Sequence, residues 1–120
     1  MKGEVKMITE ERLNVAVHDI EIRSNPGIGR RVSPGKKPVM KDDYVEWRNK
    51  AQEAIRITFP NANNVFDNFP PEGYADIEFA RADRYHVKEK PIHGEYPYQV
   101  YGLTSHEYYI GDSDPRIDVL

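Results

Sequence analysis

Apolar residues recur in one stretch of the chain, residues 43–58, at the spacing of an α-helix. At 100° per residue from Tyr44, the side chains of Trp47, Ala51 and Ile55 fall within a sector about 100° wide, the width of a core-facing stripe. Outside this stretch the apolar residues alternate with polar ones. The pattern therefore predicts one main amphipathic helix in a chain that is otherwise rich in strands.

Capping residues support the predicted helix. Asp43 is a suitable N-cap, and Glu46 three residues later completes a capping box for the unpaired backbone N–H groups. Phe59-Pro60 ends the helix, because the residue before a proline is pushed out of the α region. Trp47 is the only tryptophan in the chain, and we expect it to be the main anchor of the core.

The alternating segments predict a sheet that covers this helix. One strand is expected over residues 13–23, and three to five more follow the helix in the segments 74–88, 96–100, 106–110 and 116–120. The predicted fold class is α+β: one helix packed on a largely antiparallel sheet, in a single domain over residues 1–120.

Two segments fall outside this alternation. Residues 1–12 are polar and are interpreted as an N-terminal arm. Residues 24–41 form a long loop before the helix, which contains two Pro-Gly turns and no acidic residue. The loop is expected either to bind phosphates or an acidic neighbour, or to be a solvated surface; the candidate binding residues are Arg30, Arg31, Lys36, Lys37 and Lys41.

Composition strengthens the prediction of strands. The chain has three leucines but eight tyrosines, and tyrosine favours strands whereas leucine favours helices. A tyrosine-rich strand region suits packing or a protein interface better than a ligand pocket. The candidate interface residues are Tyr96, Tyr98, Tyr101, Tyr108 and Tyr109.

Charge is distributed unevenly along the chain. The formal net charge is −3, but residues 1–60 carry 12 basic and 9 acidic side chains, whereas residues 61–120 carry 5 basic and 11 acidic ones. A chain with one positive and one negative portion could pair with copies of itself or with a charged neighbour, or both clusters could simply face water.

Candidate chemistry is sparse. The absence of cysteine excludes a disulfide scaffold, a thiol nucleophile and a cysteine-ligated zinc. Asp112 and Asp114 form a D-x-D that suits Mg²⁺, although the same residues also spell an ordinary turn. The histidines show no ligand spacing, and no residue is assigned a catalytic role. The expected cofactor is therefore none, with Mg²⁺ as the alternative.

The order of elements, with Tyr44-Val45-Glu46-Trp47-Arg48 in the helix, Ile77-Glu78-Phe79 in a strand and Asp112-Ser113-Asp114 after it, resembles that of RusA-type Holliday-junction resolvases. Such a resemblance implies clustered aspartates that hold Mg²⁺ for phosphodiester cleavage. It covers the order of elements and not the further helix and aspartate that this family has after its D-x-D.

These observations lead to two functional hypotheses. The first is a non-enzymatic structural or assembly subunit of a larger complex, such as a virion or another multisubunit machine, which packs through the tyrosine-rich strands and the basic loop. The alternative is a small metal-dependent nuclease or nucleic-acid-binding protein. The expected partners are other protein subunits in a homo- or hetero-oligomer, with nucleic acid as the alternative partner and no membrane.

No apolar run approaches the roughly 20 residues needed to span a bilayer. The N-terminal residues also lack the apolar segment of a signal peptide. The expectation is a soluble protein that is not secreted by that route, with the virion and the cytoplasm as candidate locations.

Overall fold

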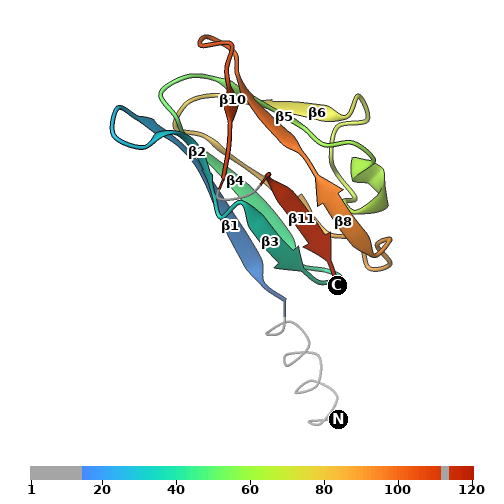
Figure 1. Cartoon of the computed structure of the whole chain (residues 1–120). Helices are drawn as coiled ribbons and strands as arrows, with labels where there is room; N and C mark the ends of the chain where they lie inside the picture. The colour runs from blue at the N-terminus through green and yellow to red at the C-terminus, as the bar shows by residue number, and fades with distance from the viewer. Residues whose placement is uncertain (1–14, 112–113) are drawn as a thin grey trace, which may run out of the picture.

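The computed structural model describes residues 15–111 and 114–120, which fold into a two-layer β-sandwich (Figure 1). The predicted N-terminal arm, residues 1–12, lies outside the described residues. Within them the chain forms eleven strands and one short 3-10 helix: β1 (Val17–Asn25), β2 (Gly29–Ser33), β3 (Lys36–Val39), β4 (Tyr44–Lys50), β5 (Ile55–Thr58), η1 (Ala62–Asn64), β6 (Tyr74–Ile77), β7 (Ala82–His86), β8 (Gly94–Pro97), β9 (Gln99–Gly102), β10 (Tyr108–Tyr109) and β11 (Arg116–Val119).

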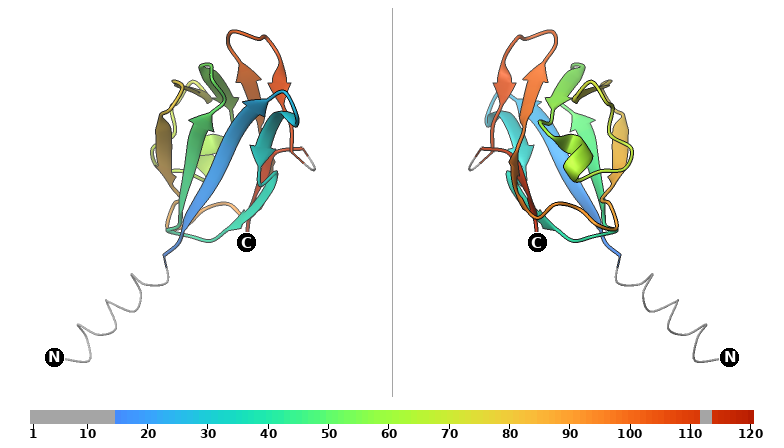
Figure 2. Two further views of the ribbon diagram at one scale, coloured as in Figure 1. Left: turned by 90° about the vertical axis from the view of Figure 1, so that its left-hand side faces the viewer. Right: turned by 90° about the vertical axis from the view of Figure 1, so that its right-hand side faces the viewer.

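One layer of the sandwich is a four-stranded sheet in the order β2-β1-β4-β7. In this sheet β1 and β4 run parallel, and the other neighbours are antiparallel. The facing layer consists of the sheets β10-β9-β5-β6 and β3-β11-β8, which are linked because β8 leads directly into β9 along the chain. The N–H of Val32 donates to the carbonyl of Ile110 at 2.8 Å, so β2 and β10 connect the layers along one side (Figure 2).

The prediction of a main helix over residues 43–58 is wrong, and so is the α+β fold class, because the described residues contain no α-helix. This segment forms β4, a turn and β5. The helical stripe misleads because Trp47, Ala51 and Ile55 are buried from three different places: Trp47 points inward from β4, Ala51 lies in the turn, and Ile55 points inward from β5 in the facing layer. All three are buried, whereas Arg48 and Lys50 are exposed, as the alternation of a strand requires.

The predicted long loop over residues 24–41 is also replaced by strands. The Asn-Pro-Gly turn is confirmed, since the Oδ1 of Asn25 accepts the N–H groups of Gly27 and Ile28 at 2.9 and 2.8 Å. This turn joins β1 to β2 in an antiparallel hairpin, and β3 then pairs parallel with β11. The basic residues had obscured both strands, because they occupy the exposed and half-exposed positions of β2 and β3.

Trp47 is the anchor of the core, as predicted from its size. It is fully buried, and four aromatic rings surround it at centroid distances of 5.4 to 6.2 Å: Phe59, Phe66, Tyr85 and Tyr98. The indole N–H of Trp47 donates to the hydroxyl of Tyr98 at 3.2 Å, so the one polar atom of the ring has a partner. The two layers are held together by this aromatic cluster between them.

Candidate binding surface at the loop end

Four turns meet at one end of the sandwich, which we call the loop end: residues 25–29, 51–54, 78–81 and 103–107 (Figures 1 and 2). The strand register places them together, because Ile55 pairs with both Ile77 and Gly102, and Arg23 pairs with Lys50. All of these pairs lie where the strands enter or leave the turns.

The backbone of the loop end is unusual. Gln52, Ala80 and His106 have φ angles of 64°, 69° and 59°, in the left-handed region that favours glycine. Each such residue costs on the order of 1–3 kcal/mol and persists only where its surroundings hold it. The loop end must therefore contain interactions that fix these turns.

The side chain of Glu53 is the centre of one such set of interactions. Its Oε1 accepts the backbone N–H groups of Thr104 and Ser105 at 2.9 and 2.8 Å. Its Oε2 accepts the hydroxyls of Ser105 and Tyr109 at 2.8 and 2.6 Å. The side chain is only 9% exposed, and the Nε of Arg30 lies 3.9 Å from Oε2. One carboxylate thus ties the 51–54 turn to the 103–107 turn.

The hydrogen bonds to Glu53 keep it ionised. Burial by itself would raise the pKa of this carboxyl, but the bonds from Tyr109, Ser105 and Thr104 outweigh burial and lower the pKa to about 2. Burial, together with the bond to the carboxylate, raises the pKa of the Tyr109 hydroxyl above its ordinary value. The phenol therefore stays a donor to Glu53 throughout the neutral range.

The packing around Glu53 also explains Gly102. A Cβ at this position would lie 2.4 Å from the Oγ of Ser105 and 2.5 Å from the Oε2 of Glu53. No room exists for a side chain unless these hydrogen-bonded atoms move. Glycine is therefore required here by close approach.

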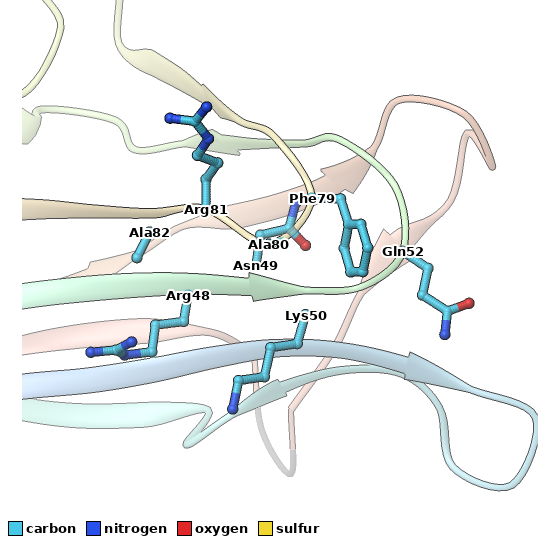
Figure 3. Close-up of a pocket in the computed structure, with 8 residues that line it drawn as sticks. All are labelled: Arg48, Asn49, Lys50, Gln52, Phe79, Ala80, Arg81 and Ala82. Atoms are coloured by element: carbon cyan, nitrogen blue, oxygen red, sulfur yellow. The ribbon is translucent and has the colours of Figure 1, made fainter.

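A hollow of about 430 Å³ opens beside the Glu53 cluster (Figure 3). It is formed by the end of β4, the turn that follows it, and the turn between β6 and β7. The lining residues are Arg48, Asn49, Lys50, Gln52, Phe79, Ala80, Arg81 and Ala82. Two of the three non-glycine residues of the loop end with a left-handed backbone, Gln52 and Ala80, are among them.

Asn49 fixes both turns that form the hollow. Its side chain is buried and donates to the carbonyls of Glu53 and Ile77, both at 2.8 Å, while its Oδ1 accepts the N–H of Ala51 at 2.9 Å. The backbone of Asn49 pairs with Ala80 and Arg81, also at 2.9 Å. Every polar atom of this buried amide has a partner within the chain. The two turns that form the walls of the hollow are therefore held in place without a ligand.

The hollow is lined by cations and by one exposed aromatic ring. Lys50 pairs with Glu21 at 2.7 Å, and Arg48 pairs with Glu46 and, at 3.5 Å, with Asp19. Arg81 forms no ion pair within residues 15–111 and 114–120. Figure 3 shows the ring of Phe79, a residue that is 52% exposed, between Gln52 and the segment 80–82.

The basic residues predicted from the sequence as one binding site are distributed over the molecule. Arg30 pairs with Glu107 at 2.8 Å, and Arg31, its neighbour in β2, donates to the carbonyl of Ile28 at 3.1 Å. Lys36 lies in β3, 3.5 Å from Asp118. Lys37 follows it in β3, and Lys41 lies beyond the end of that strand, away from the loop end. The structure does not bring these five cations together.

The predicted tyrosine interface divides into core and surface residues. Tyr98 and Tyr109 are buried, and Tyr96 is partly buried and stacks on Phe59 at 6.2 Å. Tyr101 and Tyr108 lie together at the surface, with ring centroids 4.9 Å apart, and Tyr108 is 57% exposed. Tyr101 and Tyr108, together with the exposed part of Tyr96, are therefore left at the surface.

The predicted aspartate site is described only in part. Asp112 lies outside the described residues, and Asp114 is exposed. Among the residues that the structure describes, no three histidine, aspartate or glutamate side chains are arranged to hold a metal ion. None of the described helices is long and apolar enough to cross a membrane.

Sequence reasoning missed Glu53, Asn49, Phe79 and Arg81. Glu53 and Asn49 lie within residues 43–58, which the sequence predicts as a helix, and outside its apolar stripe. One signal was available for Asn49, which has the same parity as Val45 and Trp47, so an alternating pattern would have buried it. No comparable signal marks Glu53, because its partners lie 51 to 56 residues away along the chain.

Comparison with known proteins identifies the fold. No protein-family model and no curated protein matches the chain. A purple cupredoxin from Nitrosopumilus maritimus is similar in structure, with a TM-score of 0.55, 17% identity, and coverage of 86% of this chain and 99% of that one. A mutant of amicyanin has a TM-score of 0.54 and 14% identity, over 87% of this chain and 82% of that one.

A copper-containing nitrite reductase from Thermus scotoductus SA-01 is also similar, with a TM-score of 0.54 and 16% identity, over 87% of this chain but only 27% of that one. At these identities the likeness shows the fold alone. The chain therefore has a cupredoxin-like β-sandwich fold.

The fold corrects both functional hypotheses drawn from the sequence. The assembly subunit of a virion or similar machine, and the nuclease that resembles RusA-type resolvases, both relied on a long basic loop, and that segment forms strands instead. The similar structures are a cupredoxin, amicyanin and a copper enzyme, and they support neither prediction. The expected cofactor, none or else Mg²⁺, is also wrong by this comparison, since the metal named in these proteins is copper.

Proposed function

We propose that this chain is a ligand-recognition domain of cupredoxin-like fold, whose loop end forms the recognition surface, and that it does not act through a type 1 copper centre. The observation that carries the proposal is the Glu53 cluster. A buried carboxylate with four hydrogen bonds joins two turns of the loop end, which fixes this surface by the chain's own side chains.

The side chains of this chain do not supply the ligands of a blue-copper centre, the kind of metal site that its fold suggests. A blue-copper centre uses two histidines and a cysteine thiolate, with a weak axial ligand. The sequence contains no cysteine, so the thiolate cannot be supplied by this chain. No step of electron transfer through such a centre is therefore assigned to it.

The histidines are also dispersed and engaged elsewhere. His18 lies 2.7 Å from a carboxylate oxygen of Asp43, and His86 lies 2.5 Å from one of Asp67. His93 contacts the backbone oxygen of Leu120 at 2.7 Å. His106 alone belongs to the loop end, where its Nδ1 is 3.3 Å from the hydroxyl of Tyr101. A pair of histidines that share one site is not formed among the described residues.

The features of the loop end suit recognition. Its turns are held in costly backbone conformations by Glu53 and Asn49, and preorganisation of this kind lowers the entropy lost on binding. Large apolar side chains of Ile28 and Phe79 are more than half exposed there. The sequence-based expectation of protein partners is untested and stays a prediction, for which the surface pair Tyr101 and Tyr108 is the contact to examine.

A copper titration tests the proposal. Cu²⁺ is added to the purified protein, and visible absorption and cyclic voltammetry are recorded. We expect no intense absorption from a copper–thiolate bond and no reversible one-electron couple from bound copper. A stoichiometric complex with a reversible couple would overturn the proposal, and the variant His106→Ala would then show whether the loop end holds the metal.

A further inference from the structure

We propose that the hollow between β4 and the β6–β7 turn binds a small organic anion, a carboxylate attached to an aromatic or other planar apolar body. This inference rests on the proposed function, because it names the ligand class of the same loop end. Three properties of the hollow lead to it: its preformed walls, its charge and its exposed ring.

The walls of the hollow are fixed by hydrogen bonds within the chain itself. Asn49 makes three side-chain hydrogen bonds and two backbone ones, which hold the turns on both sides. Gln52 and Ala80 keep left-handed backbones that an alanine or glutamine adopts only under constraint. The volume of about 430 Å³ lies within the range of sites for small molecules.

The charge of the hollow selects an anion. Three of its eight lining residues are cations, and none is acidic. Arg48 and Lys50 are already neutralised by carboxylates of the sheet face, at Glu46 and Glu21. Arg81 lines the hollow, is exposed and forms no ion pair within the described part of the chain. Figure 3 shows its side chain directed away from Phe79, so the guanidinium must turn toward the hollow to bind a carboxylate, which breaks no ion pair.

The apolar part of the hollow selects the body of the ligand. Phe79 is 52% exposed and lines the hollow, whose other small apolar residues are Ala80 and Ala82. An exposed phenyl ring is stabilised when a planar group stacks on it or packs against its edge. The side-chain amide of Gln52, which is exposed at the other side of the ring, offers a donor and an acceptor for orientation (Figure 3).

The test uses 2-naphthoate as the probe and 2-naphthamide as its uncharged counterpart, each titrated into the full chain while amide chemical shifts are recorded by NMR. We expect 2-naphthoate to shift the amide signals of Gln52, Ala80 and Arg81. Binding of 2-naphthamide should be about tenfold weaker or undetectable, because the guanidinium then gains no charged partner.

Three variants locate the site. Arg81→Gln and Phe79→Ala change exposed side chains and should each weaken 2-naphthoate binding about tenfold, with the rest of the spectrum unchanged. Lys90→Gln removes one exposed cation outside the hollow and should have no effect. The proposal is overturned if naphthoate shifts no loop-end signal at millimolar concentration, if the amide binds equally well, or if Arg81→Gln and Phe79→Ala leave affinity unchanged. Such a failure leaves the copper titration unaffected, so the two proposals fail separately.

Discussion

At the scale of single residues, Glu53 determines the geometry of the loop end. A carboxylate that accepts four hydrogen bonds while nearly buried is stabilised in its ionised form. Its folded-state pKa of about 2 lies below the ordinary value of 4.5. A depressed folded-state pKa adds stability above the unfolded pKa, and that stability is lost as the pH falls through this window.

Glu53→Gln should therefore lower the free energy of unfolding at pH 7 by about 3 kcal/mol, since it removes charge-assisted bonds from Tyr109 and Ser105. Urea unfolding at pH 7 and pH 3 measures this. Between pH 7 and pH 3 the free energy of unfolding of the unmodified protein should fall, because Glu53 begins to be protonated in the unfolded state. The free energy of unfolding of the variant should fall less over the same range. Equal pH dependence in both proteins would show that Glu53 does not titrate as described.

Gly102 offers a second test at this scale. Gly102→Ala places a methyl group against Ser105 and Glu53, and the overpacking should cost about 1–3 kcal/mol in thermal or urea unfolding. Gly27→Ala is the matched control, because its Cβ would meet only the Oδ1 of Asn25 at 3.5 Å. A Gly102→Ala variant as stable as the Gly27→Ala variant would contradict the close approach described for Gly102.

At the scale of elements, β4 and its flanking turns form the central unit of the fold. Asn49 occupies an inward position of this strand and connects it to the turns on both sides. Asn49→Ala removes the partner of the buried Ile77 carbonyl and Ala51 N–H and of the half-buried Glu53 carbonyl, and should lower the free energy of unfolding by about 2–4 kcal/mol. Lys50→Ala, one position on, removes an exposed ion pair and should cost less than about 1 kcal/mol. Similar losses in both variants would refute the inward placement of Asn49.

Strand β4 also shows which parts of the fold could be predicted from the sequence. The alternating segments correctly predicted strands near residues 17–25, 74–77 and 82–86, and the size of Trp47 correctly predicted its place in the core. The helix was wrong because Trp47 and Ile55 are buried from two strands in facing layers, at a sequence spacing that coincides with one helical stripe. Val45 and Asn49 would have favoured the strand period. The Glu53 cluster could not be predicted, since hydrogen bonds across more than 50 residues depend on the topology of the whole sheet.

At the scale of the whole molecule, the opposite charges of the two halves of the chain meet inside one copy. Arg30 pairs with Glu107, Arg56 with Asp76, and Lys36 with Asp118. Each of these pairs joins a residue before position 61 to one after it. Ion pairs within one copy thus partly neutralise the charge difference between residues 1–60 and 61–120, which had suggested pairing between copies.

Association of copies is therefore expected not to depend on these charges. If the protein forms oligomers through Tyr101 and Tyr108, the mass from light scattering should be the same at low and high salt, because an apolar contact is not screened. Tyr108→Ser should reduce that mass. Dissociation by salt in the unmodified protein, with no effect of Tyr108→Ser, would assign the contact to charged residues instead.

Amide hydrogen exchange in protein freed of metal tests most directly whether the chain's own side chains fix the loop end. The N–H groups of Thr104 and Ser105 donate to Glu53, so they should exchange far more slowly than in an unstructured turn, and Glu53→Gln should accelerate both. Fast exchange of these two amides in the unmodified protein, with protection only after a metal is added, would contradict the account.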